Sequence, residues 1–219
     1  MQPSPIILSL LRPAYEPCGG FSGGCRKAAE WNPAAGHVPR GFCGATARAE
    51  DVRLVLVCAE QGDPHVSESH AGDGSPEGRL ASVNIYAWEC FATGKDLFHR
   101  NVKDLLDLCW PGSSFEAHMR KTWITDSVLC SAPKECGPVP GIMEEECAAR
   151  FLVPQLSQFP DALVVALGRK AERRIRRAGI KGFEYAYSVA PPGCNLAPAR
   201  ASWKKIAALV RSRFGTDKE

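Results

Sequence analysis

The chain has 219 residues and a formal net charge of +3 at pH 7. Its 45% hydrophobic and 23% charged residues exclude a chain that is disordered throughout and are typical of a globular domain with a buried core. No apolar run approaches the roughly 18 residues of a membrane span, and the apolar stretch 5–11 has no basic residue before it. We therefore expect a cytoplasmic protein that has no signal peptide and no contact with membranes.

The basic residues are concentrated in the last third of the chain. Residues 169–213 contain 12 Lys/Arg and 2 Asp/Glu, which leaves 15 Lys/Arg and 22 Asp/Glu for the rest. This asymmetry favours a C-terminal surface that faces a polyanion. The alternative is a set of solvated helix faces with no partner.

Residues 1–52 are rich in Gly and Pro, so we expect an irregular N-terminal extension before a core at 53–214, the two forming a single domain over 1–219. Apolar runs of strand length lie at 53–60, 122–130, 162–168 and 184–190. Helical patterns alternate with them at 94–109, 143–158, 169–178 and 200–214. This alternation predicts an α/β fold, a three-layer sandwich in which helices flank a four-stranded parallel sheet.

The segments that follow the four predicted strands are expected to meet. Parallel strands present their carboxyl ends at one edge of a sheet, where ligands bind in open α/β folds. The segment after 53–60 is a long polar loop, which suggests a functional role. We therefore look for the site along this edge.

Four sequence segments together resemble a known family. Residues 163–177 (LVVALGRKAERRIRR) and 188–207 (SVAPPGCNLAPARASWKKIA) look like the single-strand-selective monofunctional type of the uracil-DNA glycosylase superfamily. Residues 124–130 (ITDSVLC) and 147–156 (CAARFLVPQL) look like its thermophile, iron-sulfur type. The resemblance implies a DNA repair enzyme, acting as a monomer, that flips a uracil nucleotide out of DNA, hydrolyses its N-glycosidic bond and releases uracil.

Cleavage of the glycosidic bond requires a group that orients water and donors that stabilise the departing base anion. Asp63-Pro64-His65 is similar to the Asp-Pro-Tyr water-activating motif of the family, and Gly62 lies beside it as a substrate-binding candidate. Glu60, at the strand end, is similar to the Glu of the iron-sulfur type, so the two acids are alternatives for this role. A structural reading is also open, in which Asp63 caps a turn and Glu60 is solvated.

Base recognition is expected after the second strand. The family has an Asn there that pairs with uracil, whereas this chain has Asp126. An ionised carboxylate cannot donate a hydrogen bond, so Asp126 either stays protonated and pairs with uracil or stays ionised and favours a base with an exocyclic amine. Ser127 and backbone groups are the candidates for the missing donor. In the alternative interpretation Asp126 simply hydrogen-bonds a loop. Phe91 is the preferred stacking partner for the flipped base, with Phe98 as the alternative in a helix interior.

The largest departure from the family lies after the fourth strand. Ala190 stands where the family has a His that donates to the uracil O2, so Asn195, His65 or backbone N–H groups would have to replace it. Leu196 resembles the apolar wedge that enters the duplex as the nucleotide leaves, unless it packs under its own loop. The candidates for binding the DNA backbone are Arg169, Lys170, Arg200 and Lys204.

Ten cysteines raise the question of a metal site. Cys130 and Cys147 match two ligand positions of the iron-sulfur type, and Cys18 and Cys25 are candidates for the other two. Cys43 and Cys136 compete with that pair as ligands. We expect any such cluster to be structural rather than catalytic; the alternative is a set of small buried thiols.

Two further functions remain open at this stage. Because Ala190 replaces a donor, the chain could be a binding module for uracil-containing or damaged DNA with weak or no base excision. Because Asp126 replaces an Asn, an enzyme could instead act on cytosine or hypoxanthine.

Overall fold

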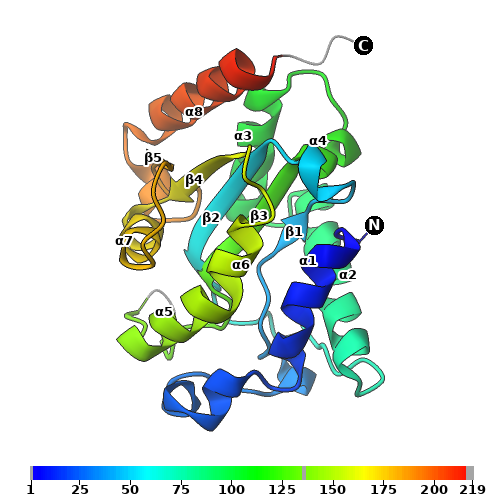
Figure 1. Ribbon diagram of the computed structural model, residues 1–219. Helices are drawn as coiled ribbons and strands as arrows, with labels where there is room; N and C mark the ends of the chain where they lie inside the picture. The colour runs from blue at the N-terminus through cyan, green and yellow to red at the C-terminus, as the bar shows by residue number, and fades with distance from the viewer. Residues whose placement is uncertain (1, 135–136, 216–219) are drawn as a thin grey trace.

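The computed structural model describes residues 2–134 and 137–215 and consists of a mixed five-stranded sheet between helical layers (Figure 1). Its strands are β1 (Cys43–Gly44), β2 (Leu54–Glu60), β3 (Thr122–Val128), β4 (Leu163–Leu167) and β5 (Glu184–Ala186). Their order across the sheet is β1-β3-β2-β4-β5. The α/β class is confirmed, and each predicted strand contains an observed one.

The predicted purely parallel sheet of four strands is wrong in one respect. β2, β3, β4 and β5 are parallel, but β1 adds to the edge of the sheet antiparallel to β3. Gly44 makes this pairing possible, since a Cβ there would lie 2.1 Å from the Thr122 carbonyl oxygen. Its φ of +104° also favours glycine.

The α-helices fall into two sets (Figure 1). Alternate strand residues separate two apolar cores, with Val55 and Val57 in the first and Leu54 and Leu56 in the second. The first core is covered by α1 (Pro5–Leu11), α5 (Gly141–Cys147), α6 (Val153–Leu156) and α7 (Arg169–Arg177). The second is covered by α3 (Leu97–Cys109) and α8 (Ala199–Phe214). The remaining α-helices are α2 (Pro76–Thr93) and α4 (Phe115–Lys121).

Helix α2 was not expected from the sequence. It starts after Ser75, whose hydroxyl accepts a hydrogen bond from the Gly78 N–H at 2.9 Å. Its buried residues contribute to both cores, with Val83 in the first and Phe91 in the second. A helix that is buried on more than one side has no single apolar stripe, so its sequence lacks the apolar periodicity that predicts an amphipathic helix.

The N-terminal extension is more ordered than predicted. Besides α1 and β1 it contains short 3₁₀ helices at Arg12–Tyr15, Gly19–Ser22, Gly24–Lys27, Pro33–Ala35 and Ala49–Asp51. Ile7, Leu11 and Tyr15 are fully buried in the first core, and the Tyr15 hydroxyl donates to the Pro39 carbonyl oxygen at 2.6 Å. Residues 1–52 therefore pack onto the sheet as part of the same core.

The predicted helix 143–158 is divided into two α-helices. Residues Ala148–Leu152 form a π-helical turn between α5 and α6, just before Pro154, whose nitrogen cannot donate a hydrogen bond. Another short 3₁₀ helix, Gly193–Asn195, precedes α8. In the part of the chain that the structure describes, no helix combines the length and apolarity needed to cross a membrane.

Gln155 on α6 satisfies buried polar groups of the central strand β3. Its Oε1 accepts from the Trp123 indole N–H and from the Thr125 hydroxyl, both at 3.0 Å, and its amide donates to the Phe151 carbonyl oxygen at 3.0 Å. We expect Gln155→Leu to lower the free energy of unfolding by about 2–5 kcal/mol, because each orphaned buried donor costs about 1–3 kcal/mol.

Denaturant unfolding of the two proteins checks this. The matched control is Gln158→Leu on the partly exposed side of the same segment, which should cost far less. Equal losses for the two variants would contradict a special role of Gln155.

Candidate functional site

The carboxyl ends of β2 and β3 lie side by side, as predicted. Cys58 pairs with Asp126 and Glu60 with Val128 in the parallel register. The Ser127 hydroxyl donates to the Ala59 carbonyl oxygen at 2.6 Å and thereby joins the two strand ends. Its single hydrogen is used in that bond, so Ser127 does not supply the free donor to a base that the sequence analysis considered.

Glu60 lies inward rather than in solvent. Its side chain is 6% exposed, and its two oxygens lie 2.6 Å from Lys170 Nζ and 2.6 Å from Arg174 Nη1. Lys170 also donates to the Gly137 carbonyl oxygen at 2.9 Å. The ammonium group predicted to hold a DNA phosphate thus contacts a carboxylate of the sheet edge.

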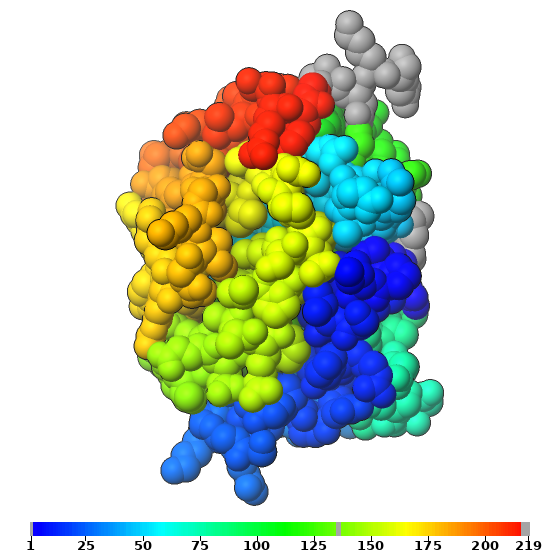
Figure 2. Space-filling view, in the orientation of Figure 1, coloured from blue at the N-terminus to red at the C-terminus, as the bar shows by residue number. Residues whose placement is uncertain are grey.

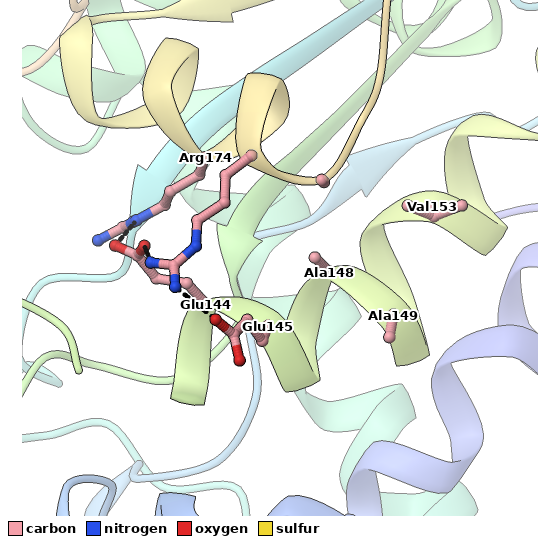
Figure 3. Close-up of a pocket in the computed structure, with 8 residues that line it drawn as sticks. Glu144, Glu145, Ala148, Ala149, Val153 and Arg174 are labelled. Carbon is pink, nitrogen blue, oxygen red and sulfur yellow. Dashed lines mark hydrogen bonds and ion pairs between the residues drawn. The ribbon is translucent and has the colours of Figure 1, made fainter. Parts of the chain in front are cut away.

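Arg174 is a buried member of this cluster that the sequence analysis missed. Its guanidinium donates to the Ala59 carbonyl oxygen at 2.7 Å and to Glu144 Oε1 at 2.9 Å. Glu144 comes from α5, so Arg174 joins α7, α5 and β2 (Figure 3). The sequence signal was the spacing from Lys170 to Arg174, which places both cations on one side of α7.

A hollow of about 200 Å³ lies between α5 and α7 next to this cluster. Figure 3 shows Glu144, Glu145 and Arg174 at one end of it and Ala148, Ala149 and Val153 along it. Arg177 pairs with Glu145 across the hollow. The hollow therefore borders the sheet edge through Arg174, whereas Asp126 does not line it.

Asp126 is buried beneath two neighbouring residues. It is 3% exposed, and burial, reinforced by the charge of Glu60, raises its pKa well above the ordinary value of 3.8 despite the nearby Arg174 and Arg40. A Cβ on Gly41 would lie 2.0 Å from Asp126 Oδ2 and 1.4 Å from Gln61 Nε2. Asp126 is thus a buried acid whose pKa is raised, and Gly41 and Gln61 lie close to its carboxyl group.

Asp63 lies on the exposed loop that follows Glu60. Arg40 is buried beside this loop and donates to the Gly62 carbonyl oxygen at 2.6 Å. Burial lowers the pKa of Arg40, while the charges of Glu68, Asp126 and Asp63 act in the opposite direction. Arg40 therefore has Asp63 and Asp126 among its acidic neighbours, and sequence reasoning missed it because it precedes the predicted core.

His65 is exposed in the same loop, with Nδ1 2.7 Å from the Ser67 hydroxyl oxygen. Phe91 is only 2% exposed, and its ring centroid lies 5.8 Å from that of Phe98 and 4.6 Å from that of His99. The expectation that Phe91 stacks on a flipped base is therefore corrected. It lies in the last turn of α2 and belongs to the second core.

The segment after β5 lies beside the start of α7. Gly168 packs against Ser188, since a Cβ on the glycine would lie 3.1 Å from the Ser188 Cβ. Asn195 is exposed and its side chain accepts from Cys194 Sγ at 3.4 Å. Leu196 is 53% exposed, as a wedge would require. The contacts of Asn195 do not bring it into the cluster around Glu60.

Each of the five arginines of the basic helix α7 contacts an acidic side chain. Arg169 and Arg176 pair with Glu172, and Arg173 pairs with Glu144. Arg200 on α8 pairs with Asp104 at 2.7 Å, whereas Lys204 is exposed on the same helix. Figure 2 shows α7 and the segment leading to α8 on one face of the molecule next to α5. The charge asymmetry thus partly reflects ion pairs within the fold.

The four predicted cluster cysteines are all buried and close enough to influence one another. Burial raises the pKa of Cys130, and the thiols of Cys147, Cys18 and Cys25 raise it further. Cys18 and Cys25 flank Gly20, where a Cβ would lie 3.4 Å and 2.9 Å from their sulfur atoms. The two N-terminal thiols and the two from the core therefore gather in one buried region.

Among the described residues, no group of three or more His, Cys, Asp or Glu side chains has the spacing to hold a single metal ion. A multi-iron cluster separates its ligands more widely than one ion does, and four buried thiols from separate segments fit such a cluster in residue type and number. Cys43 lies in the second core and does not compete, whereas Cys136 lies outside the described residues.

Compared with known proteins, the chain matches no family model and no curated protein sequence. Its function must therefore be argued from the residues of the sheet edge. These residues combine a buried acid whose pKa is raised, an exposed acid on a loop and two buried arginines, Arg40 and Arg174.

The raised pKa of Asp126 makes its contribution to stability depend on pH. The folded protein holds the proton of Asp126 more tightly than the unfolded chain does, because the pKa is higher in the folded state. The stability that this proton contributes is fully present below about pH 3.8 and is lost as the pH rises through the folded-state pKa. We expect Asp126→Asn to match the original protein near pH 3.8 and to become more stable than it toward neutral pH, by up to about 1.4 kcal/mol for each pH unit.

Urea unfolding of both proteins between pH 4 and pH 8 measures the difference. Asp161→Asn, which removes an exposed carboxylate, is the control for the substitution itself. A difference between Asp126→Asn and the original protein that is constant over this pH range would contradict a raised pKa of Asp126.

Proposed function

We propose that the protein is a DNA glycosylase that hydrolyses the N-glycosidic bond of a flipped uracil, on a fold like that of the uracil-DNA glycosylase superfamily. The observations that support this most are the buried Asp126 with its raised pKa and the exposed Asp63, whose loop is held at Gly62 by the buried Arg40. Glycosidic hydrolysis needs one group that recognises the base and another that orients water. The two acids differ in environment in the way these roles require.

Asp126 supplies the recognition of the base. A protonated carboxyl group has one donor and one acceptor, which match the O4 acceptor and N3–H donor of uracil. The same pair, reversed, also matches cytosine, so this acid accounts for pyrimidine recognition and leaves the choice between the two bases to other contacts. Gln61 lies next to Asp126 at Gly41, so in this proposal it moves aside for the base.

Asp63 orients the attacking water. It is exposed, whereas both oxygens of Glu60 already contact cations at 2.6 Å. Glu60 therefore serves to hold Lys170 and Arg174 at the sheet edge. His65 and Asn195 stay candidates for a direct donor, because Ala190 has no side-chain donor.

The substrate in this proposal is uracil-containing DNA and the product is uracil, in the cytoplasm, with the protein acting as a monomer. Leu196 on its exposed loop would enter the base stack, and Lys204 would contact a phosphate. Arg169 and Arg200 would do so once their ion pairs with Glu172 and Asp104 break. Exposed pairs of this kind contribute only about 0–1 kcal/mol, so a phosphate can replace the carboxylate.

A second function is favoured by two observations at the same edge. Ala190 offers no side-chain donor, and Asp126 is covered by Gly41 and Gln61. Both features fit a module that binds uracil-containing DNA and releases base slowly or not at all. Tight binding without release distinguishes this function from the enzyme.

We further propose that Cys18, Cys25, Cys130 and Cys147 hold a structural iron-sulfur cluster. A bound cluster would deprotonate these thiols and join residues 18–25 to the core around β3 and α5. The cluster's role is to fix the fold, and catalysis stays with the acids of the sheet edge.

Single-turnover release of free base from uracil-containing oligonucleotides tests the function. Asp63→Asn should lower the rate by about 10²–10⁴-fold, the range of general acid–base catalysis, with little change in affinity for DNA. Glu60→Gln should retain more activity than Asp63→Asn, because it removes only the negative charge that pairs with Lys170 and Arg174. Single- and double-stranded substrates with uracil, cytosine or hypoxanthine define the preferred base and strand.

The outcomes separate the alternatives. Loss of rate in Glu60→Gln but not in Asp63→Asn would exchange the roles of the two acids. Absence of base release from every substrate, with retained binding, would leave the binding module as the function.

Anaerobically purified protein should contain iron and sulfide and absorb visible light. Cys130→Ala should lose the absorbance and the iron, because a ligand is removed. Cys109→Ala is the matched control, since this buried thiol lies in the second core. Protein without iron, or equal iron in both variants, would contradict the proposed ligand set.

A further inference from the structure

The loop between β2 and α2 combines exposed and buried residues. Asp63, His65 and Val66 are exposed, whereas the side chains of Glu68 and His70 are 5% and 1% exposed. An unpaired buried carboxylate is costly, so the partners of Glu68 determine where this loop can lie.

Glu68 connects three groups. Its Oε1 lies 2.9 Å from His70 Nε2 and 3.2 Å from Arg40 Nε, and its Oε2 accepts from the His65 backbone N–H at 3.1 Å. Burial acts to raise the pKa of Glu68, but the hydrogen bond from His70 and the charge of Arg40 outweigh it and hold the pKa below its ordinary value. Glu68 is therefore ionised near neutral pH and keeps its pair with Arg40.

Arg40 contacts the loop both before and after Asp63, at Gly62 and at Glu68. Its Nη2 donates to the Gly62 carbonyl oxygen at 2.6 Å, and its Nη1 donates to the Gly36 carbonyl oxygen at 3.3 Å. The Ser131 hydroxyl donates to the same oxygen of Gly62 at 2.9 Å. One buried guanidinium thus spans the loop from Gly62 to Glu68, with Asp63 between the two attachments.

His70 attaches this cluster to α2. Its Nδ1 lies 3.1 Å from the Ser82 hydroxyl oxygen, and its ring meets that of Tyr86 edge to face at 5.5 Å. Its backbone N–H donates to the Pro33 carbonyl oxygen at 2.7 Å. The loop is therefore held to α2 and to the N-terminal segment through buried contacts.

We propose that Arg40, Glu68 and His70 form a positioning unit that fixes Asp63 where it orients the attacking water. The inference rests on the proposed function and deepens it. The three side chains act through the loop backbone, so they are positioning residues. Displacing a catalytic group by about 1 Å can lower a rate about 100-fold, which is the effect we expect from breaking the unit.

The first test needs no activity. Hydrogen exchange in peptides covering residues 61–69 should become faster in Glu68→Gln and Arg40→Met than in the original protein. The matched control is His118→Ala, which removes another buried histidine, hydrogen-bonded to the Trp110 carbonyl oxygen at 3.1 Å. Unchanged exchange in 61–69 for Glu68→Gln overturns the proposal, and this milder variant carries the test if Arg40→Met fails to fold.

The second test measures single-turnover base release and DNA affinity separately. Glu68→Gln should lower the rate about 100-fold with little change in Kd, whereas His118→Ala should leave both nearly unchanged. The double variant Asp63→Asn/Glu68→Gln should be no slower than Asp63→Asn alone, because both changes remove the action of one group.

Independent, multiplicative losses in the double variant would overturn the proposal that the unit acts through Asp63. Full activity in Asp63→Asn would instead refute the proposed catalytic role of that acid. In that case, as with a protein that releases no base, hydrogen exchange still decides whether Arg40, Glu68 and His70 fix the loop.

Discussion

The arrangement of this sheet edge depends on the ion pairs and hydrogen bonds made by the buried guanidinium of Arg174. It contacts Glu60 at the end of β2, Glu144 on α5 and the Ala59 carbonyl oxygen. Removing ions from water costs several kcal/mol each unless the geometry compensates, and here two carboxylates and a carbonyl surround one cation. The position of α7 relative to the sheet follows from this requirement, and Lys170 is brought onto Glu60 with it.

Arg40 plays the corresponding part for the loop after β2. It holds the carbonyl of Gly62 and the carboxylate of Glu68, so the loop after β2 is fixed while Asp63 stays exposed. Asp126 lies near both arginines, yet its pKa is raised, because burial and the negative charge of Glu60 outweigh the two cations. The site therefore combines a buried acid whose pKa is raised with an accessible acid, the two environments that the proposed recognition of a base and activation of water require.

Some of the site residues that the sequence suggested lie together in the structure, and others do not. Glu60 and Asp126 lie on adjacent strands because the parallel register puts Cys58 beside Asp126. Asn195 lies on the segment after β5, which β4 separates from β2 in the sheet, and its side chain contacts the neighbouring Cys194. Phe91 enters the second core because α2 runs through the region predicted to be loop. In each case the pattern identified the segment, whereas packing decided where the side chain went.

The sequence by itself determined the α/β class, the four parallel strands and the edge at which polar residues gather, because apolar runs and their helical alternation are local patterns. It also identified the four cysteines that gather in the first core, from their resemblance to a ligand set. Only the tertiary structure decided that β1 extends the sheet, that Glu60 pairs with Arg174 and Lys170, and that Arg40 joins Gly62 to Glu68. Arg40 and Glu68 are 28 residues apart, and Glu60 and Arg174 are 114 apart. Contacts at such separations depend on how whole elements pack, and no local periodicity encodes them.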